Sequence, residues 1–282
     1  MSNLISARDL STRLDSSSLR VLDVRASLVD SASGRQLYDA GHIPGARFMS
    51  LDDDLAGPVA AHGGRHPLPE MDMFAAKLGA LGVGNDSEVV VYDADGGMFG
   101  ARLWWLLRYA GLDSVQVLDG GFVAWEEVGL PVTAEASEVA QVTFTPHLRP
   151  EMIVSLDEVR AKLGDRHTLL IDARAPERYR GEVEPLDKKA GHIPGAINRP
   201  FAENLERGRF KSPETLRKRF AEAEGADEVI LYCGSGVSAA HNALALAEAG
   251  IEGAKLYVGS WSDWSSYDDN PVATGGEARG SD

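Results

Sequence analysis

The chain has 282 residues, enough for two domains, and its composition of 44% hydrophobic and 25% charged residues is that of a folded globular protein. Its formal net charge of −15 argues against nucleic acid and anionic membranes as partners. Its single cysteine excludes an internal disulfide. The chain has no apolar run of about eighteen residues and does not start with a basic segment followed by an apolar one. We therefore expect no transmembrane helix, no signal peptide and a cytoplasmic location.

Short strands and helices are expected to alternate along the chain. The first half has a helix capped by Ser6, strands at 21–24, 88–92 and 115–118, and helices at 74–81 and 101–110. The second half repeats this order with a helix after Ser155, strands at 169–172, 229–232 and 255–258, and helices at 213–223 and 239–249. This alternation predicts an α/β fold in which each half forms a small parallel sheet with helices on both faces.

The two halves are also copies of one unit at the level of sequence. Ala40–Ala46 (Ala-Gly-His-Ile-Pro-Gly-Ala) recurs unchanged at 190–196, and three further segments match in the same order: 21–25 with 170–174, 89–93 with 229–233, and 120–125 with 259–264. We expect a first domain at 1–134, a linker at 135–150, a second domain at 151–276 and a flexible tail at 277–282. His42 and His192 occupy the same place in both copies, so we expect them to serve the fold.

The only cysteine, Cys233, follows an apolar strand and opens a glycine-containing turn (Cys-Gly-Ser-Gly-Val-Ser) that leads into a helix. Such a turn lets backbone N–H groups converge, and the helix adds the positive end of its dipole. Both favour an anion, for which a Cys233 thiolate is the nearest candidate. The alternative is a buried cysteine that only packs. Asp93 stands at the matching position of the first half, so only the second copy can supply a thiol nucleophile.

The paired Gly-His-Ile-Pro-Gly motifs, the Cys233 turn and the Gly259-Ser260-Trp261 segment resemble the tandem-domain rhodanese-type sulfurtransferases. Within that family, the turn resembles the 3-mercaptopyruvate enzymes. The resemblance implies two rhodanese-like domains in tandem and sulfur transfer through a Cys233 persulfide, with pyruvate released. No cluster of residues has the spacing of metal ligands, and we expect no cofactor and no metal. The resemblance implies a thiol such as thioredoxin, a small thiol or cyanide as sulfur acceptor. The alternative donor is thiosulfate, whose enzymes carry basic residues at the positions of Gly234 and Ser235.

The resemblance also implies roles for individual residues. The loop N–H groups of Gly234, Ser235, Gly236, Val237, Ser238 and Ala239 would hold the anionic sulfur. Arg178, in Arg-Tyr-Arg-Gly, would bind the donor's carboxylate, or else pair only with Glu177 or Glu182. A second family arginine is replaced by Leu186, and Lys188 or Lys189 are the candidates to substitute for it.

Mercaptopyruvate enzymes are further proposed to use a serine–histidine–aspartate relay, for which this chain offers Ser235, His66 and Asp52. A polarised hydroxyl could manage the proton of the departing enolate. The alternative makes His66 a loop histidine and 52–54 a solvated acidic run.

Two other classes of protein fit less well. A cysteine phosphatase needs an arginine about six residues after its cysteine, where this chain has Ala239. A non-catalytic binding module would not require a thiol in a glycine turn.

Overall fold

The computed structural model describes residues 2–276, so the expected tail at 277–282 lies outside the described part. Contacts divide the chain into two compact units. Of the described residues, the first comprises 2–57, 68–149 and 207–210, and the second comprises 58–67, 150–206 and 211–276. Each is described by itself.

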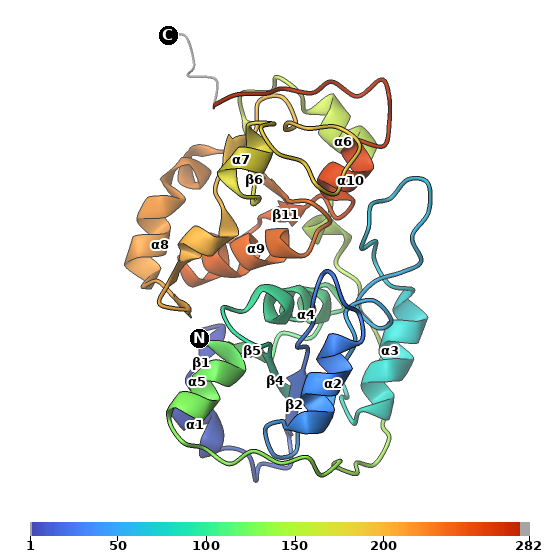
Figure 1. Cartoon of the computed structure of the whole chain (residues 1–282), viewed down its shortest axis with the longest axis vertical. Coiled ribbons are helices and arrows are strands. Elements are labelled where there is room, and N and C mark those ends of the chain that lie inside the picture. Colours follow the sequence, from blue (N-terminus) through green and yellow to red (C-terminus); the bar gives the residue numbers. More distant parts are fainter. Residues whose placement is uncertain (1, 277–282) are drawn as a thin grey trace. The chain divides into compact units, whose positions relative to one another are not determined.

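The first unit is built on a five-stranded parallel sheet (Figure 1). Its strand order is β1 (Leu4–Ile5), β5 (Val115–Leu118), β4 (Glu88–Tyr92), β2 (Leu19–Asp23) and β3 (Arg47–Phe48). Its helices are α1 (Ala7–Ser11), α2 (Ser33–Ala40), α3 (Met71–Ala80), α4 (Met98–Tyr109) and α5 (Gly121–Glu127), and a short strand, β9 (Arg209–Phe210), also belongs to it. The alternation predicted for this half is confirmed, and so is the cap, since Ser6 accepts a hydrogen bond from the Asp9 N–H.

The second unit repeats this plan with a four-stranded sheet. Its strand order is β11 (Lys255–Leu256), β10 (Glu228–Tyr232), β6 (Thr168–Asp172) and β7 (Ile197–Asn198), all parallel. Its helices are α6 (Leu156–Ala161), α7 (Pro176–Tyr179), α8 (Pro213–Arg219), α9 (Ser238–Glu248) and α10 (Ser260–Trp264), with 3₁₀ turns at 150–152, 201–204 and 221–225 and a short strand β8 (Leu205–Glu206). Helices α8 and α9 cover one face, and α6, α7 and α10 cover the other (Figure 1).

The inner strands β4 and β10 are apolar after their first residue, as expected for sheets covered on both faces. In β10 every residue from Val229 to Tyr232 is buried. Ile230 and Tyr232 join a core cluster with Trp261 and Trp264 of α10. In a parallel sheet with helices on both faces, ligands bind beyond the carboxyl ends of the strands, where the connecting loops lie. The residue after β10 is Cys233.

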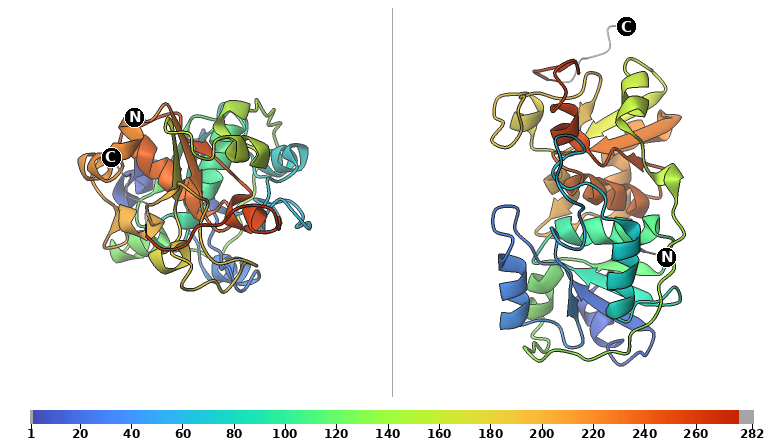
Figure 2. Two further views of the ribbon diagram at one scale, coloured as in Figure 1. Left: turned by 90° about the horizontal axis from the view of Figure 1, so that it is seen from above. Right: turned by 90° about the vertical axis from the view of Figure 1, so that its right-hand side faces the viewer.

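Segment 58–67 lies between parts of the first unit in sequence but belongs to the second unit. It is attached to the region of α10: the Gly63 N–H donates to Asp263 Oδ1 at 2.7 Å, and the Arg65 N–H donates to Ser262 Oγ at 3.1 Å. His62 stacks on Tyr267 with ring centroids 4.0 Å apart. The right-hand view of Figure 2 shows this blue segment beside the red α10. Segment 207–210 lies between parts of the second unit in sequence but belongs to the first unit. Its Phe210 N–H donates to Asp119 of the first unit.

His42 and His192 serve the fold, as their repetition predicted. Each is buried, and each Nδ1 lies within hydrogen-bond distance of a helix-end carbonyl, that of Tyr38 at 2.8 Å and that of Tyr179 at 2.7 Å. Each imidazole also stacks on that tyrosine. The stretch expected as a linker packs on the first unit, where Phe144 is buried and the Val142 N–H donates to Gly79.

Candidate active site

Cys233 lies directly after β10, at the point where the chain turns into α9. The side chain is 2% exposed, and its sulfur accepts a hydrogen bond from the Gly236 N–H at 3.1 Å. Gly236 adopts a φ of 82°, a left-handed conformation that a residue with a Cβ rarely takes. This glycine therefore permits the backbone to fold back so that an N–H points at the thiol. Gly234, Ser235 and Val237 are buried with it, while Ser238 and Ala239 begin α9.

The loop is held from behind by α10. The Cys233 N–H donates to Ser260 Oγ at 3.1 Å, and the N–H groups of Trp261 and Ser262 donate to the carbonyls of Cys233 and Gly234. Ser260 is fully buried and has a φ of 55°, which is strained for a residue other than glycine. The strained serine thus fixes the backbone of the nucleophile candidate.

Ser235 and His66, two members of the expected relay, are in contact in the second unit. His66 Nδ1 lies 2.8 Å from Ser235 Oγ, and the serine is 6% exposed. Asp52 lies in the first unit, on an exposed turn after β3. Its neighbour Asp53 accepts from Ser50, and Asp54 pairs with Lys77. The part of Asp52 in a relay stays a prediction.

Arg178 lies in the last turn of α7 and pairs with residues other than the neighbours considered from the sequence. Its Nη2 donates to Glu184 Oε1 at 2.7 Å and to Asp187 Oδ2 at 3.2 Å. Both carboxylates are almost fully buried, with 3% and 4% of their side chains exposed. Burial raises the pKa of Asp187, against the opposing effect of nearby Arg65. Glu184 also accepts a hydrogen bond from Arg174, which in turn pairs with the buried Asp172 at the end of β6.

Arg65 is a residue of this site that the sequence reading missed. Its Nη1 pairs with Asp187 Oδ1, and its guanidinium lies beside the turn, because a Cβ placed on Gly234 would be 3.0 Å from Arg65 Nη2. The same Cβ would be 3.3 Å from Arg178 Nη1. The turn itself carries no charge, but two guanidinium groups flank it. The signal that could have revealed Arg65 is its position directly before His66.

The lysines considered as substitutes for Leu186 lie elsewhere. Lys189 Nζ donates to the carbonyls of Tyr267 and Asp268, and Lys188 and Leu186 are exposed. Within the part of the chain that the structure describes, no three His, Cys, Asp or Glu side chains gather as metal ligands would. Over the same residues, no helix is both long and apolar enough to cross a bilayer.

In the corresponding turn of the first unit, the backbone N–H groups bind a carboxyl group of the protein itself, that of Asp93. The Asp93 carboxyl accepts hydrogen bonds from the N–H groups of Gly97, Phe99 and Gly100 at 2.8–3.1 Å. Burial raises its pKa to about 7, although those three bonds act in the opposite direction. The repeated turn therefore provides converging N–H donors, and in the first copy a side chain of the protein occupies them.

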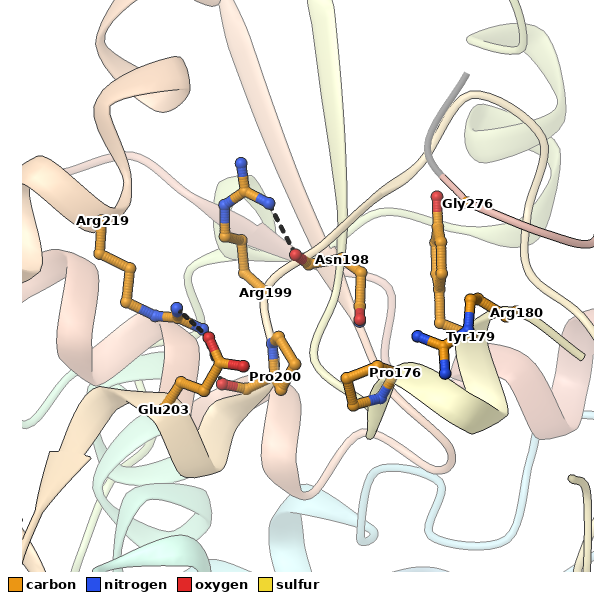
Figure 3. A pocket seen from close by; sticks show the side chains of 9 residues that line it. All are labelled: Pro176, Tyr179, Arg180, Asn198, Arg199, Pro200, Glu203, Arg219 and Gly276. Carbon is orange, nitrogen blue, oxygen red and sulfur yellow. Dashed lines mark hydrogen bonds and ion pairs between the residues drawn. The ribbon is translucent and has the colours of Figure 1, made fainter. Parts of the chain in front are cut away.

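A cavity of about 290 Å³ in the second unit is separate from the Cys233 turn (Figure 3). It is lined by Arg180, Arg199, Arg219 and Glu203, among others, and not by the Cys233 turn. Its cations are engaged: Arg219 pairs with Glu203, and Arg199 donates to the carbonyl of Asn198. The chemistry of Cys233 belongs to the turn and not to this cavity.

The model of the rhodanese-like domain matches residues 6–128 and 155–267. This chain belongs to the rhodanese-like family. It carries two such domains in tandem, as the resemblance in its motifs implied.

Among its rhodanese-like relatives, a protein of Pseudomonas aeruginosa named "Probable 3-mercaptopyruvate sulfurtransferase" is 45% identical over 96% of this chain and 98% of its own length. A thiosulfate sulfurtransferase of Gallus gallus is 36% identical over 87% of this chain and 86% of its own. The crystal structure of SseA from Escherichia coli, described with the fold and mechanism of 3-mercaptopyruvate sulfotransferases, has a TM-score of 0.81 at 31% identity and covers 93% of this chain and 100% of its own.

Proposed function

We propose that this protein is a sulfurtransferase that takes sulfur from 3-mercaptopyruvate and passes it to a thiol or to cyanide. The observation that carries the proposal is the Cys233 thiol at the carboxyl end of β10, with the Gly236 N–H directed at its sulfur. The names of the Pseudomonas aeruginosa relative and of SseA from Escherichia coli support this donor.

In the first step the Cys233 thiolate attacks the donor's sulfur. An S–S bond forms, the C–S bond of the donor breaks, and its electron pair leaves on pyruvate as an enolate. We propose that the turn from Gly234 to Ala239 holds the resulting persulfide, whose outer sulfur is anionic. In the second step an acceptor thiolate, such as that of thioredoxin or a small thiol, or cyanide, attacks the outer sulfur and releases Cys233.

The enolate needs a proton to become pyruvate. The hydroxyl of Ser235 and the imidazole of His66, in contact at 2.8 Å, are suited to supply it, and Asp52 is our proposed third member of the relay. Arg178 is the proposed partner of the donor's carboxylate, because an arginine binds a carboxylate with directed, charge-assisted bonds. The proposed domain limits remain 1–134 and 151–276, with a linker at 135–150, and the proposed compartment is the cytoplasm.

Thiosulfate is the second candidate donor. It is favoured by the name of the Gallus gallus relative and by the two guanidinium groups near Gly234, which suit a dianion. Glu184 and Asp187, however, already bind those guanidinium groups and offset their charge. An α-keto acid with one carboxylate therefore fits better.

The deciding experiment measures kcat/KM with 3-mercaptopyruvate and with thiosulfate, using cyanide as acceptor. We expect a preference for mercaptopyruvate, one added sulfur on the Cys233 peptide by mass spectrometry, and no turnover in Cys233→Ser, because a serine hydroxyl cannot form a persulfide. A preference for thiosulfate would transfer the assignment to the second donor, and turnover in the serine variant would refute the mechanism.

A further inference from the structure

One carboxylate lies between two arginines at this site. Asp187 accepts from Arg65 Nη1 on its Oδ1 and from Arg178 Nη2 on its Oδ2. Only 4% of the Asp187 side chain is exposed. A buried carboxylate shared by two guanidinium groups holds both in fixed orientations, since each bond is charge-assisted and directional.

Each guanidinium then turns another nitrogen toward the turn after Cys233. Arg65 Nη2 and Arg178 Nη1 would lie 3.0 and 3.3 Å from a Cβ on Gly234. Among the described residues 2–276, none accepts a hydrogen bond from either nitrogen. Two positively charged nitrogens that can donate hydrogen bonds thus lie beside the backbone next to the thiol. The absence of a side chain at Gly234 leaves room for them.

We propose that Arg65 and Arg178 together bind the carboxylate of the sulfur donor, and that Asp187 is the positioning residue that aligns them. The proposal rests on the proposed function. In it, Arg65 is the second cation, in place of the family arginine that is replaced by Leu186. Arg65 comes from segment 58–67, so the donor would be recognised by two segments far apart in sequence. Specificity for an α-keto acid then follows from directed N–H bonds and not from a net positive charge.

A purely structural role for Arg65 is the competing explanation, because its pairing with Asp187 could simply attach segment 58–67 to the second unit. The two roles differ in their dependence on the donor. A lost carboxylate contact weakens only donors that have a carboxylate. A loosened segment would also disturb the Ser235–His66 contact and would impair every donor that leaves as an enolate, with or without a carboxylate.

The test compares 3-mercaptopyruvate with mercaptoacetone, which keeps the thiol and the ketone but lacks the carboxylate. For Arg65→Leu we expect the KM for mercaptopyruvate to rise about ten- to hundredfold, the effect of one charge-assisted hydrogen bond. We expect kcat/KM for mercaptoacetone to stay unchanged. Arg65→Lys should recover part of the loss, and Arg180→Leu, a matched control whose partner is the exposed Glu182, should change neither donor.

A binding measurement separates this proposal from the proposed function. Calorimetry with pyruvate on Cys233→Ser protein reports the carboxylate site without turnover, and adding Arg65→Leu should weaken pyruvate binding by a similar factor. Equal losses with both donors, or pyruvate binding that does not depend on Arg65, would overturn the proposal. If mercaptopyruvate proves not to be a donor, the proposed function fails, and the pyruvate measurement still decides whether Arg65 binds a carboxylate.

Discussion

The buried carboxyl of Asp93 should make the first unit less stable as the pH rises. Burial raises the pKa of Asp93 to about 7 in the folded protein, whereas the ordinary value is 3.8. Below pH about 4 the carboxyl is protonated in both states. Between about 4 and 7 the unfolded chain ionises this group and the folded chain does not, so stability falls through this window and is level above it.

The size of the effect follows from those two values. A difference of about 3 pH units at about 1.36 kcal/mol per unit amounts to about 4 kcal/mol in the free energy of unfolding. In Asp93→Asn the side chain is neutral at every pH, so this dependence should vanish. The amide can accept from only part of the three N–H donors, and its NH₂ faces another donor. A cost of about 1–3 kcal/mol that does not vary with pH should therefore remain.

Hydrogen exchange under mild denaturant, followed in the peptide that carries β4 and α4, reports the opening of this region separately from the second unit. The stability of the wild type relative to Asp93→Asn should fall by about 3 kcal/mol between pH 4.5 and 8. Asp95→Asn, an exposed neighbour, is the matched control and should keep most of the dependence. If the difference in free energy of unfolding between the wild type and Asp93→Asn is constant with pH, or if it grows in favour of the wild type as the pH rises, the reasoning is refuted.

Two further changes test the second unit. His66→Ala should lower kcat for mercaptopyruvate by about 10²-fold or more, because the enolate leaving group needs a proton. It should scarcely affect turnover of thiosulfate, whose sulfite leaving group needs no proton. Equal losses of kcat with the two donors would make His66 a packing residue. Ser260→Ala removes the acceptor of the Cys233 N–H and should lower the free energy of unfolding by about 1–3 kcal/mol. Unchanged amide exchange at Cys233 would show that this bond contributes little.

The sequence was sufficient to predict what is encoded locally. Apolar runs located β4 and β10, and the glycines beside Cys233 located the turn, because both signals lie within a few neighbouring residues. The limits of α4 were less accurate. It begins at Met98 and not at Ala101, because the left-handed Gly97 starts the helix early and its first N–H groups bind Asp93. The helix expected at 213–223 ends at Arg219 and is followed by a 3₁₀ turn.

Contacts between distant segments could not be predicted in the same way. Arg65 and Asp187 are 122 positions apart, and neither has a periodic pattern that marks it as part of a site. Two-residue strands such as β3 and β7 were also missed, since two residues are too few to show an alternation. The family resemblance supplied Arg178 and the Ser235–His66 pair, whereas residue patterns alone indicated only a reactive thiol.

The exchange of segments between the two units has a consequence for how the protein is made. Residues 58–67 leave the ribosome well before the second unit that they complete, and residues 207–210 complete the first unit only after most of the chain has been synthesised. Domains generally fold one after another during synthesis, starting from the N-terminus. Here neither unit has all its parts until translation has passed residue 210. A gene cut at the boundary between the repeats would separate Arg65 and His66 from Cys233, and each half would be produced without a segment that its fold includes.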